Sequence, residues 1–355
     1  MDEEEDKRRL RHHFHDDSQL FAFDLPELTR AFLKISGKEF YNVLASTPRP
    51  AIDDTNVNGR TTLAWAARQG DGDAVKALLA CGADPNHKDI AGSTPLHASV
   101  YAGAPECLRL LLNAKADVDV KDNFGRTALT VAVQVEDQTD FSELLLSHGA
   151  GIEYTSDMGW TPLRSAAKNN RPKQASLLLA KGADINASDP HGRTAFHLAI
   201  TFKSSAVVII LLNNPGLDYE RKSNNGSTAI HLGALYADVE TLEILEATDL
   251  SNIDLDAVDT DGNTALVCAR WRRYDNEDWA NWAVEPRDED PEAWYEAFKE
   301  LMISILISQR EDVLGDSESK FSPCASGSSV GDDLEGSEDQ QDEEDECYDT
   351  AEEGD

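Results

Sequence analysis

The sequence predicts an all-α solenoid of stacked helix–turn–helix units, followed by a disordered acidic tail. A G-x-T-x-hydrophobic motif recurs seven times, and successive copies are 33, 33, 34, 33, 34 and 36 residues apart. An apolar helical segment ending in a turn of small residues follows the motif. So regular a period indicates a repeat array rather than a single globular core. The leading glycines are Gly59, Gly92, Gly125, Gly159, Gly192, Gly226 and Gly262.

Each repeat is expected to contain two helices, as the copy GSTPLHASVYAG at 92–103 illustrates. Thr94 is suited to N-cap the first helix, because its hydroxyl can accept from an otherwise unpaired N–H. Pro95 then takes the first helical position, where no N–H donor is needed. The second helix is expected to end at a glycine, since glycine tolerates the left-handed C′ conformation. Such glycines are Gly82, Gly149 and Gly182.

The period and the T-P-L-H-x-A pattern resemble the ankyrin repeat. The resemblance covers residues 56 to about 307, with repeats starting near 56, 89, 122, 156, 189, 223 and 259. It implies an ankyrin-repeat solenoid of helix–turn–helix units with hairpin-like loops. Its implied function is non-catalytic protein–protein recognition. One departure from the pattern puts local geometry in doubt, because Arg164 stands where three other copies carry histidine.

The N-terminal region is expected to cap the array, because a stack of repeats exposes an apolar face at each end. Residues 1–20 are predicted to be a disordered arm, and 21–55 a helical cap or degenerate repeat containing two short helices. The LPEL segment at 25–28 leaves a second interpretation open, an F-box-like helix.

The last repeat is predicted to carry an acidic insertion at 275–291, after which its second helix resumes. Four tryptophans lie in this region and either cover the end of the stack or form an aromatic docking patch. They are Trp271, Trp279, Trp282 and Trp294. Residues 308–355 are predicted to be a disordered tail, because 311–355 hold 18 acidic residues and one lysine and cannot bury a core.

Composition argues against several functional classes. The net charge of −35 disfavours nucleic-acid binding and docking on anionic membranes. No apolar run is long enough to span a bilayer, no signal-peptide pattern opens the chain, and the five cysteines form no disulfide framework. An intracellular protein, cytoplasmic or nuclear, is therefore expected.

No pattern in the sequence supports an enzyme, a cofactor site or a metal site. Nucleotide-binding, zinc-protease and hydrolase motifs are missing. Histidines recur at one repeat position and are predicted to hydrogen-bond within the scaffold. They are His97, His197 and His231.

The resemblance implies that a partner binds the concave face, formed by loop tips and the ends of the first helices. Aromatic rings and cations occupy these positions, where the fold does not require them. The candidate binding residues are Arg60, Arg68, Tyr101, Arg126, Lys168, Arg193, Phe202, Tyr236 and Trp271. Isolated exposed rings are also ordinary on protein surfaces, so a neutral interpretation stays open.

The predicted function is a scaffold or adaptor that binds a protein partner, either an extended acidic peptide or the chain's own tail. Two alternatives remain. One is an F-box-like ubiquitin-ligase substrate adaptor, and the other is a chaperone-like protein whose acidic tail binds basic proteins.

Overall fold

The computed structural model describes residues 25–34, 39–135, 137–250, 253–274 and 290–319. The chain divides into two units at Asp312, and all seven helix pairs begin in the first unit. Within the described residues the regular structure is helical, apart from one isolated bridge between Thr55 and Thr61. The predicted all-α class is therefore confirmed for the repeats.

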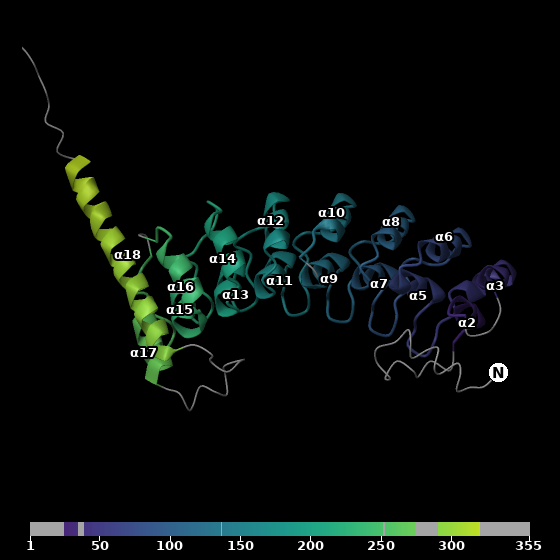
Figure 1. Ribbon diagram of the computed structural model, residues 1–355, viewed down its shortest axis with the longest axis horizontal. Coiled ribbons are helices and arrows are strands. Elements are labelled where there is room, and N and C mark those ends of the chain that lie inside the picture. Colours follow the sequence, from purple (N-terminus) through teal and green to yellow (C-terminus); the bar gives the residue numbers. More distant parts are fainter. Residues whose placement is uncertain (1–24, 35–38, 136, 251–252, 275–289, 320–355) are drawn as a thin grey trace, which may run out of the picture. The chain divides into compact units, whose positions relative to one another are not determined.

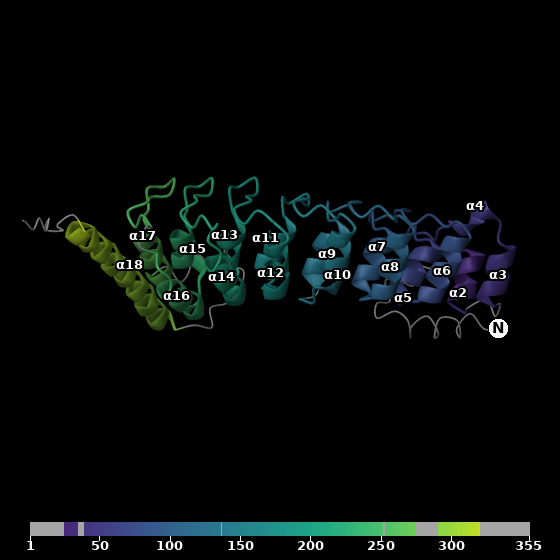
Figure 2. The same cartoon turned by 90° about the horizontal axis from the view of Figure 1, so that it is seen from above.

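Each repeat consists of two helices, and equivalent helices of successive repeats lie side by side in two rows (Figures 1 and 2). The first helices are α5 (Thr62–Gln69), α7 (Pro95–Tyr101), α9 (Ala128–Val135), α11 (Pro162–Lys168), α13 (Ala195–Thr201), α15 (Ala229–Tyr236) and α17 (Ala265–Tyr274). The second helices are α6 (Gly72–Ala80), α8 (Pro105–Asn113), α10 (Asp140–Ser147), α12 (Pro172–Ala180), α14 (Ser205–Leu212), α16 (Val239–Glu246) and α18 (Pro291–Ser319).

The recurring threonine and histidine begin three of the first helices by capping one another. In α7 the N–H of Thr94 donates to Nδ1 of His97 over 3.3 Å. This assigns the ring proton to Nε2, which lies 3.1 Å from the carbonyl oxygen of Arg126 in the next repeat. The pairs Thr194–His197 and Thr228–His231 repeat the cap. The histidines are therefore scaffold groups, as predicted from their spacing.

The N-terminal segment packs against the first repeat. It forms α2 (Glu27–Phe32), α3 (Phe40–Ser46) and α4 (Arg49–Ile52). Leu25 and Leu28, the two leucines of LPEL, are buried in the same apolar cluster as α5. The hydroxyls of Thr29 and Thr62 meet at 2.7 Å. LPEL therefore contributes to packing at the end of the stack.

At the other end, Trp294 of α18 is buried and covers the last repeats. Its indole N–H donates to the carbonyl of Ala237 over 2.9 Å, and its ring stacks on Phe298. The guanidinium of Arg272 lies 4.0 Å from the ring centroid. Trp294 is thus a capping residue, whereas Trp271 on α17 remains 40% exposed.

The C-terminal boundaries differ from the prediction. The helix α18 begins at Pro291, the last residue assigned to the insertion, and continues to Ser319 instead of ending near residue 307. No proline interrupts this stretch, and the side-chain amide of Gln309 donates to the carbonyl of Ile253 over 2.7 Å. Trp279, Trp282, residues 1–20 and the tail beyond residue 319 lie outside the described residues.

Buried apolar side chains form two clusters rather than one continuous core. The first extends from Leu25 to Ala150 and the second from Val133 to Ile305. They meet in the third repeat, where Leu146 packs against both.

Polar contacts join the third and fourth repeats at this boundary. The buried side chain of Gln174 donates to the carbonyl of Gln138 over 2.6 Å. The guanidinium of Arg171 donates to the carbonyl of Val135 over 3.2 Å. Polar contacts therefore accompany apolar packing between repeats three and four.

Candidate protein-binding surface

In five of the seven repeats, the loop before the first helix is built around one side chain that accepts two backbone N–H groups. In the third repeat, Oδ1 of Asp122 accepts from the N–H groups of Phe124 (2.9 Å) and Arg126 (2.8 Å). Gly125 at the tip has a φ of 70°, and a Cβ there would lie 2.5 Å from the backbone nitrogen of Asp157. Only glycine fits both conditions. Asn56, Asp89, Asp189 and Asp259 hold their loops in the same way.

Backbone hydrogen bonds also connect the tip of one loop with the next. The N–H of Asn123 donates to the carbonyl of Ala91, and the N–H of Asp157 donates to the carbonyl of Phe124. Equivalent bonds join Ile90 to Asn58, Asn224 to His191 and Thr260 to Asn225. The series is interrupted between repeats four and five, because Pro190 has no N–H to donate.

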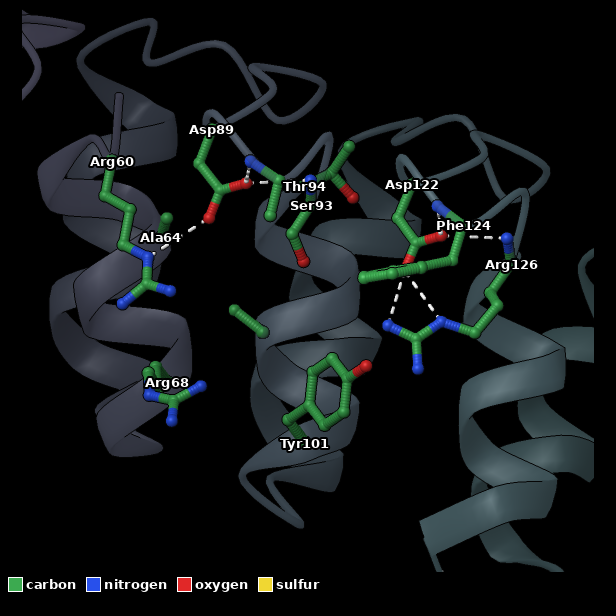
Figure 3. Close-up of a pocket in the computed structure, with 12 residues that line it drawn as sticks. Arg60, Ala64, Arg68, Asp89, Ser93, Thr94, Tyr101, Asp122, Phe124 and Arg126 are labelled. Carbon is green, nitrogen blue, oxygen red and sulfur yellow. Dashed lines mark hydrogen bonds and ion pairs between the residues drawn. The ribbon is translucent and has the colours of Figure 1, made fainter. Parts of the chain in front are cut away.

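Four of the nine predicted binding residues line one hollow of about 120 Å³ across the first three repeats (Figure 3). They are Arg60, Arg68, Tyr101 and Arg126. The small side chains of Ala64 and Ala98 also line the hollow and leave it open.

Two of these arginines are already paired with loop carboxylates. Nε of Arg60 lies 3.1 Å from Oδ2 of Asp89. Arg126 makes a two-point contact with Oδ2 of Asp122, through Nε at 2.9 Å and a terminal nitrogen at 2.7 Å. Arg68 makes no hydrogen bond or ion pair with any of the described residues. Burial, followed by the positive charge of Arg60, lowers the pKa of Arg68.

Aromatic rings border the same hollow. Tyr101 is 38% exposed and Phe124 63% exposed. The guanidinium of Arg126 lies 4.9 Å from the ring centroid of Phe124 and 6.0 Å from that of Tyr101. The hollow therefore combines accessible ring surface with a cation that makes no hydrogen bond or ion pair with the described side chains.

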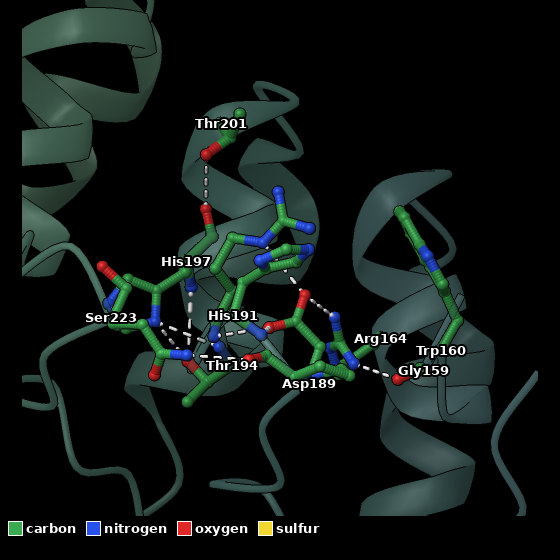
Figure 4. A network of polar contacts seen from close by, with 12 residues as sticks. Gly159, Trp160, Arg164, Asp189, His191, Thr194, His197, Thr201 and Ser223 are labelled. Carbon is green, nitrogen blue, oxygen red and sulfur yellow. Dashed lines mark hydrogen bonds and ion pairs between the residues drawn. The ribbon is translucent and has the colours of Figure 1, made fainter. Parts of the chain in front are cut away.

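A second group of predicted residues gathers on repeats four and five. Nζ of Lys168 lies 4.6 Å from the ring centroid of Trp160 and 5.3 Å from that of Phe202. Nearby, Nε of Arg193 contacts Asp189 at 2.9 Å, and this carboxylate also receives the buried guanidinium of Arg164 (Figure 4). Lys168 is thus flanked by rings from two repeats.

The remaining predicted residues lie apart from the hollow. Tyr236 is half-buried against the second apolar cluster, and burial raises its pKa. Trp271 is exposed on α17. Tyr236 is therefore a poorer contact candidate than its position in the repeat indicated.

Sequence reasoning missed the residues that determine the charge of the hollow. Asp89 and Asp122 neutralise two arginines, and Phe124 adds the most exposed ring. A signal was present, because each aspartate stands three residues before the leading glycine of its repeat.

Other chemistry finds little support among the described residues. No three of their His, Cys, Asp and Glu side chains gather as a metal site would require. None of their helices is both long and apolar enough to cross a membrane. Burial raises the pKa of the thiols of Cys107 and Cys268 to about 11, which keeps both protonated and unreactive at neutral pH.

Comparison with known proteins identifies the family. The family model for ankyrin repeats matches four overlapping segments, 32–122, 63–156, 112–189 and 143–223, which together cover more than half of the chain. The chain belongs to the ankyrin-repeat family. An ankyrin-repeat array is a protein–protein interaction domain, and the proteins of this family are generally not catalytic.

Several curated relatives match the ankyrin repeats of this chain. It is 31% identical over 147 residues to the human neurogenic locus notch homolog protein 1, covering 41% of this chain and 6% of the relative. It is 29% identical over 189 residues to the human SH3 and multiple ankyrin repeat domains protein 2, covering 53% and 10%. It is 28% identical over 229 residues to the Gallus gallus nuclear factor NF-kappa-B p105 subunit, covering 57% and 23%. The matches thus span less than a quarter of each relative.

A solved structure matches the ankyrin fold of this chain. The ankyrin-repeat domain of human ASB11 aligns with a TM-score of 0.53 and 24% identity, over 67% of this chain and 98% of that domain. At this identity the likeness shows the fold alone.

Proposed function

We propose that this ankyrin-repeat protein is a non-catalytic scaffold or adaptor that binds a protein partner on its loop–helix surface. We define that surface as the loop tips together with the C-terminal ends of the first helices. The observation that carries the proposal is the hollow on repeats one to three, where Arg68 and the rings of Tyr101 and Phe124 are accessible together. Aromatic residues and arginine are the side chains most enriched at binding hot spots.

The proposed mechanism is rigid display of side chains. The loop carboxylates and the bonds between loop tips fix the backbone, so the arginines and rings project from set positions. A second group at Trp160, Lys168 and Phe202 extends the surface to repeats four and five. An extended peptide running along the tips would contact both groups.

The F-box-like alternative receives less support than the scaffold. Such a segment would need side chains accessible to a ligase subunit. Leu25 and Leu28 are instead buried against the first repeat, which supports a capping role.

The test is affinity capture from extracts of cells that express the chain, with captured proteins quantified. The double variant Tyr101→Ala, Phe202→Ala removes two exposed rings from the surface. We expect its specific partner to bind about 30-fold more weakly, or not at all, because hot-spot truncations cost about 2 kcal/mol or more. The matched control is Arg109→Ala, Ile209→Ala, which alters exposed residues on the second helices. Equal retention by both variants contradicts the proposal.

A form ending at residue 319 addresses the tail in the same experiment. If the chain's own acidic tail occupies the surface, this shortened form captures more partner than the full chain does. If the tail itself binds basic proteins, as in the chaperone-like alternative, the shortened form loses its partners and the ring variants keep theirs.

A further inference from the structure

The hollow on repeats one to three has an uneven charge distribution. Its lining contains three arginines and two aspartates, which leaves one net positive charge. Asp89 and Asp122 are committed to their loops, because Oδ1 of each accepts two backbone N–H groups. Their Oδ2 atoms neutralise Arg60 and Arg126. The positive charge that remains is therefore centred on Arg68.

Arg68 lies where a bound side chain could reach it. It is exposed at the end of α5, across the hollow from the phenol ring of Tyr101 on α7 (Figure 3). Partial burial and then the like charge of Arg60 lower the pKa of Arg68, and Tyr101 and Asp89 offset this only in part, so an anion placed here would favour the charged guanidinium. A guanidinium donates through a planar fork that matches the two oxygens of a carboxylate.

The rest of the lining favours an apolar neighbour for that anion. Ala64 and Ala98 leave space between the helices, and Phe124 and Tyr101 present ring surface. Phe124 stands at the loop tip on the opposite side of the hollow from Arg68 (Figure 3). A ligand filling the hollow would thus meet a cation on one side and a ring on the other.

We propose that this hollow is a subsite for one carboxylate side chain, held by Arg68, of an extended partner peptide in which an apolar residue adjoins the acid and packs on Phe124 and Tyr101. The proposal rests on the proposed protein-binding function and assigns its partner chemistry. Of the four predicted residues that line the hollow, Arg68 alone receives the acid, because Arg60 and Arg126 already hold carboxylates of the chain itself. One net positive charge fits the single charge of Asp or Glu better than the double charge of a phosphate.

The experiment selects binders from random 12-residue peptides displayed on phage, using the full-length chain as bait. We expect the enriched peptides to share one Asp or Glu beside an apolar residue. In a synthetic copy, changing that acid to its amide should weaken binding to the unmodified chain about tenfold or more, since hydrogen bonds to charged groups are the strong ones. The same change in the peptide should alter its affinity for the Arg68→Gln variant less than twofold, because this variant lacks the guanidinium that the acid contacts.

A charge exchange tests the contact directly. Arg68→Glu should reject the acidic peptide and accept one with lysine at the same position. Arg109→Glu, a charge reversal at another exposed arginine, on α8, should leave both preferences unchanged. Circular dichroism confirms that the variants are folded. A phosphoserine peptide that binds more tightly than its glutamate counterpart overturns the assignment to a carboxylate.

The outcomes separate this inference from the proposed function. Peptides that need Tyr101 and Phe202 but carry no common acid, or ignore Arg68, leave the scaffold proposal standing and overturn the carboxylate subsite. Peptides that ignore Arg68, Tyr101 and Phe202 alike overturn both. A selection that enriches no peptide also counts against both.

Discussion

The guanidinium of Arg164 donates a 2.6 Å hydrogen bond to the carboxylate of Asp189, and both side chains are fully buried. The pair joins repeats four and five at the junction where Pro190 interrupts the bonds between loop tips. In the second and sixth repeats, a histidine at the equivalent position contacts the next loop instead. Burial alone would raise the pKa of Asp189, but the N–H of Arg193 and the two guanidinium charges hold it below its ordinary range.

Arg164→Ala should lower the free energy of unfolding by about 3–5 kcal/mol, because it leaves a buried carboxylate without its buried partner. The matched variant Arg193→Ala removes the half-exposed partner of the same carboxylate and should cost about 1 kcal/mol or less. Urea unfolding of both variants measures the difference. Equal losses would show that the buried contact has no special importance.

Stability should fall in mild acid because of His197. Burial lowers its pKa to about 4, whereas the unfolded chain keeps the ordinary value of 6.5. Between these values the unfolded chain binds more protons than the folded one. The contribution of His197 to the free energy of unfolding is therefore fully present above pH 6.5 and is lost as the pH falls toward 4. The loss between pH 7.5 and pH 5 should be about 2 kcal/mol.

The variant His197→Asn isolates this contribution. Its amide oxygen can still accept from the N–H of Thr194 but does not titrate. Urea unfolding at pH 7.5 and pH 5 should show a smaller loss for this variant than for the unmodified chain. Exposed His191→Asn serves as the control and should behave like the unmodified chain. Asp189, with its lowered pKa, contributes below pH 4 and does not affect this window.

The division of the apolar core into two clusters, which meet in the third repeat, should divide unfolding into two steps. The stability of a repeat array is approximately a sum of repeat and interface contributions, so a weaker interface separates the parts. Hydrogen exchange at intermediate urea should group the amides of α5–α8 apart from those of α12–α16. Gln174→Ala should widen the separation, whereas Lys173→Ala, on the exposed side of α12, should not. If both groups of amides lost protection at the same urea concentration, the prediction would be contradicted.

Trp294→Ala should uncover the end of the array. The variant loses the buried contacts of the ring and the hydrogen bond to Ala237. The free energy of unfolding should therefore fall by about 3–5 kcal/mol, as for other truncations of buried aromatic residues. Trp271→Ala removes a ring that is 40% exposed and should cost much less than Trp294→Ala, about 1 kcal/mol or less. Thermal unfolding followed by circular dichroism distinguishes them. A greater loss for Trp271 would reverse the assignment of the cap.

The repeat period made much of the fold predictable. Thr94 and His97 recur at fixed spacing, so a local role in starting the helix followed from their positions. The role of Arg164 did not, because its partner Asp189 lies 25 residues away in another repeat's loop. The length of α18 was also underestimated, since its acidic composition resembled the tail and the contact of Gln309 with Ile253 is non-local.

The candidate surface was predictable as a set of positions but not as a charge pattern. The residues of the hollow were expected to be accessible, and Arg68 and Tyr101 are. Which arginines form ion pairs depends on the positions of the loop aspartates. Tyr236 is half-buried because it packs against the second apolar cluster. Such contacts depend on the assembled stack, so a single repeat's sequence does not reveal them.

The hydrogen bonds between loop tips have a consequence for kinetics. Because Asn123, Asp157 and their equivalents are tied to the preceding loop before any partner arrives, little loop entropy is lost at encounter. Collision should then yield a productive complex without a slow rearrangement of the protein. Differences in affinity among ring variants should appear mainly as changes in residence time rather than in the association rate.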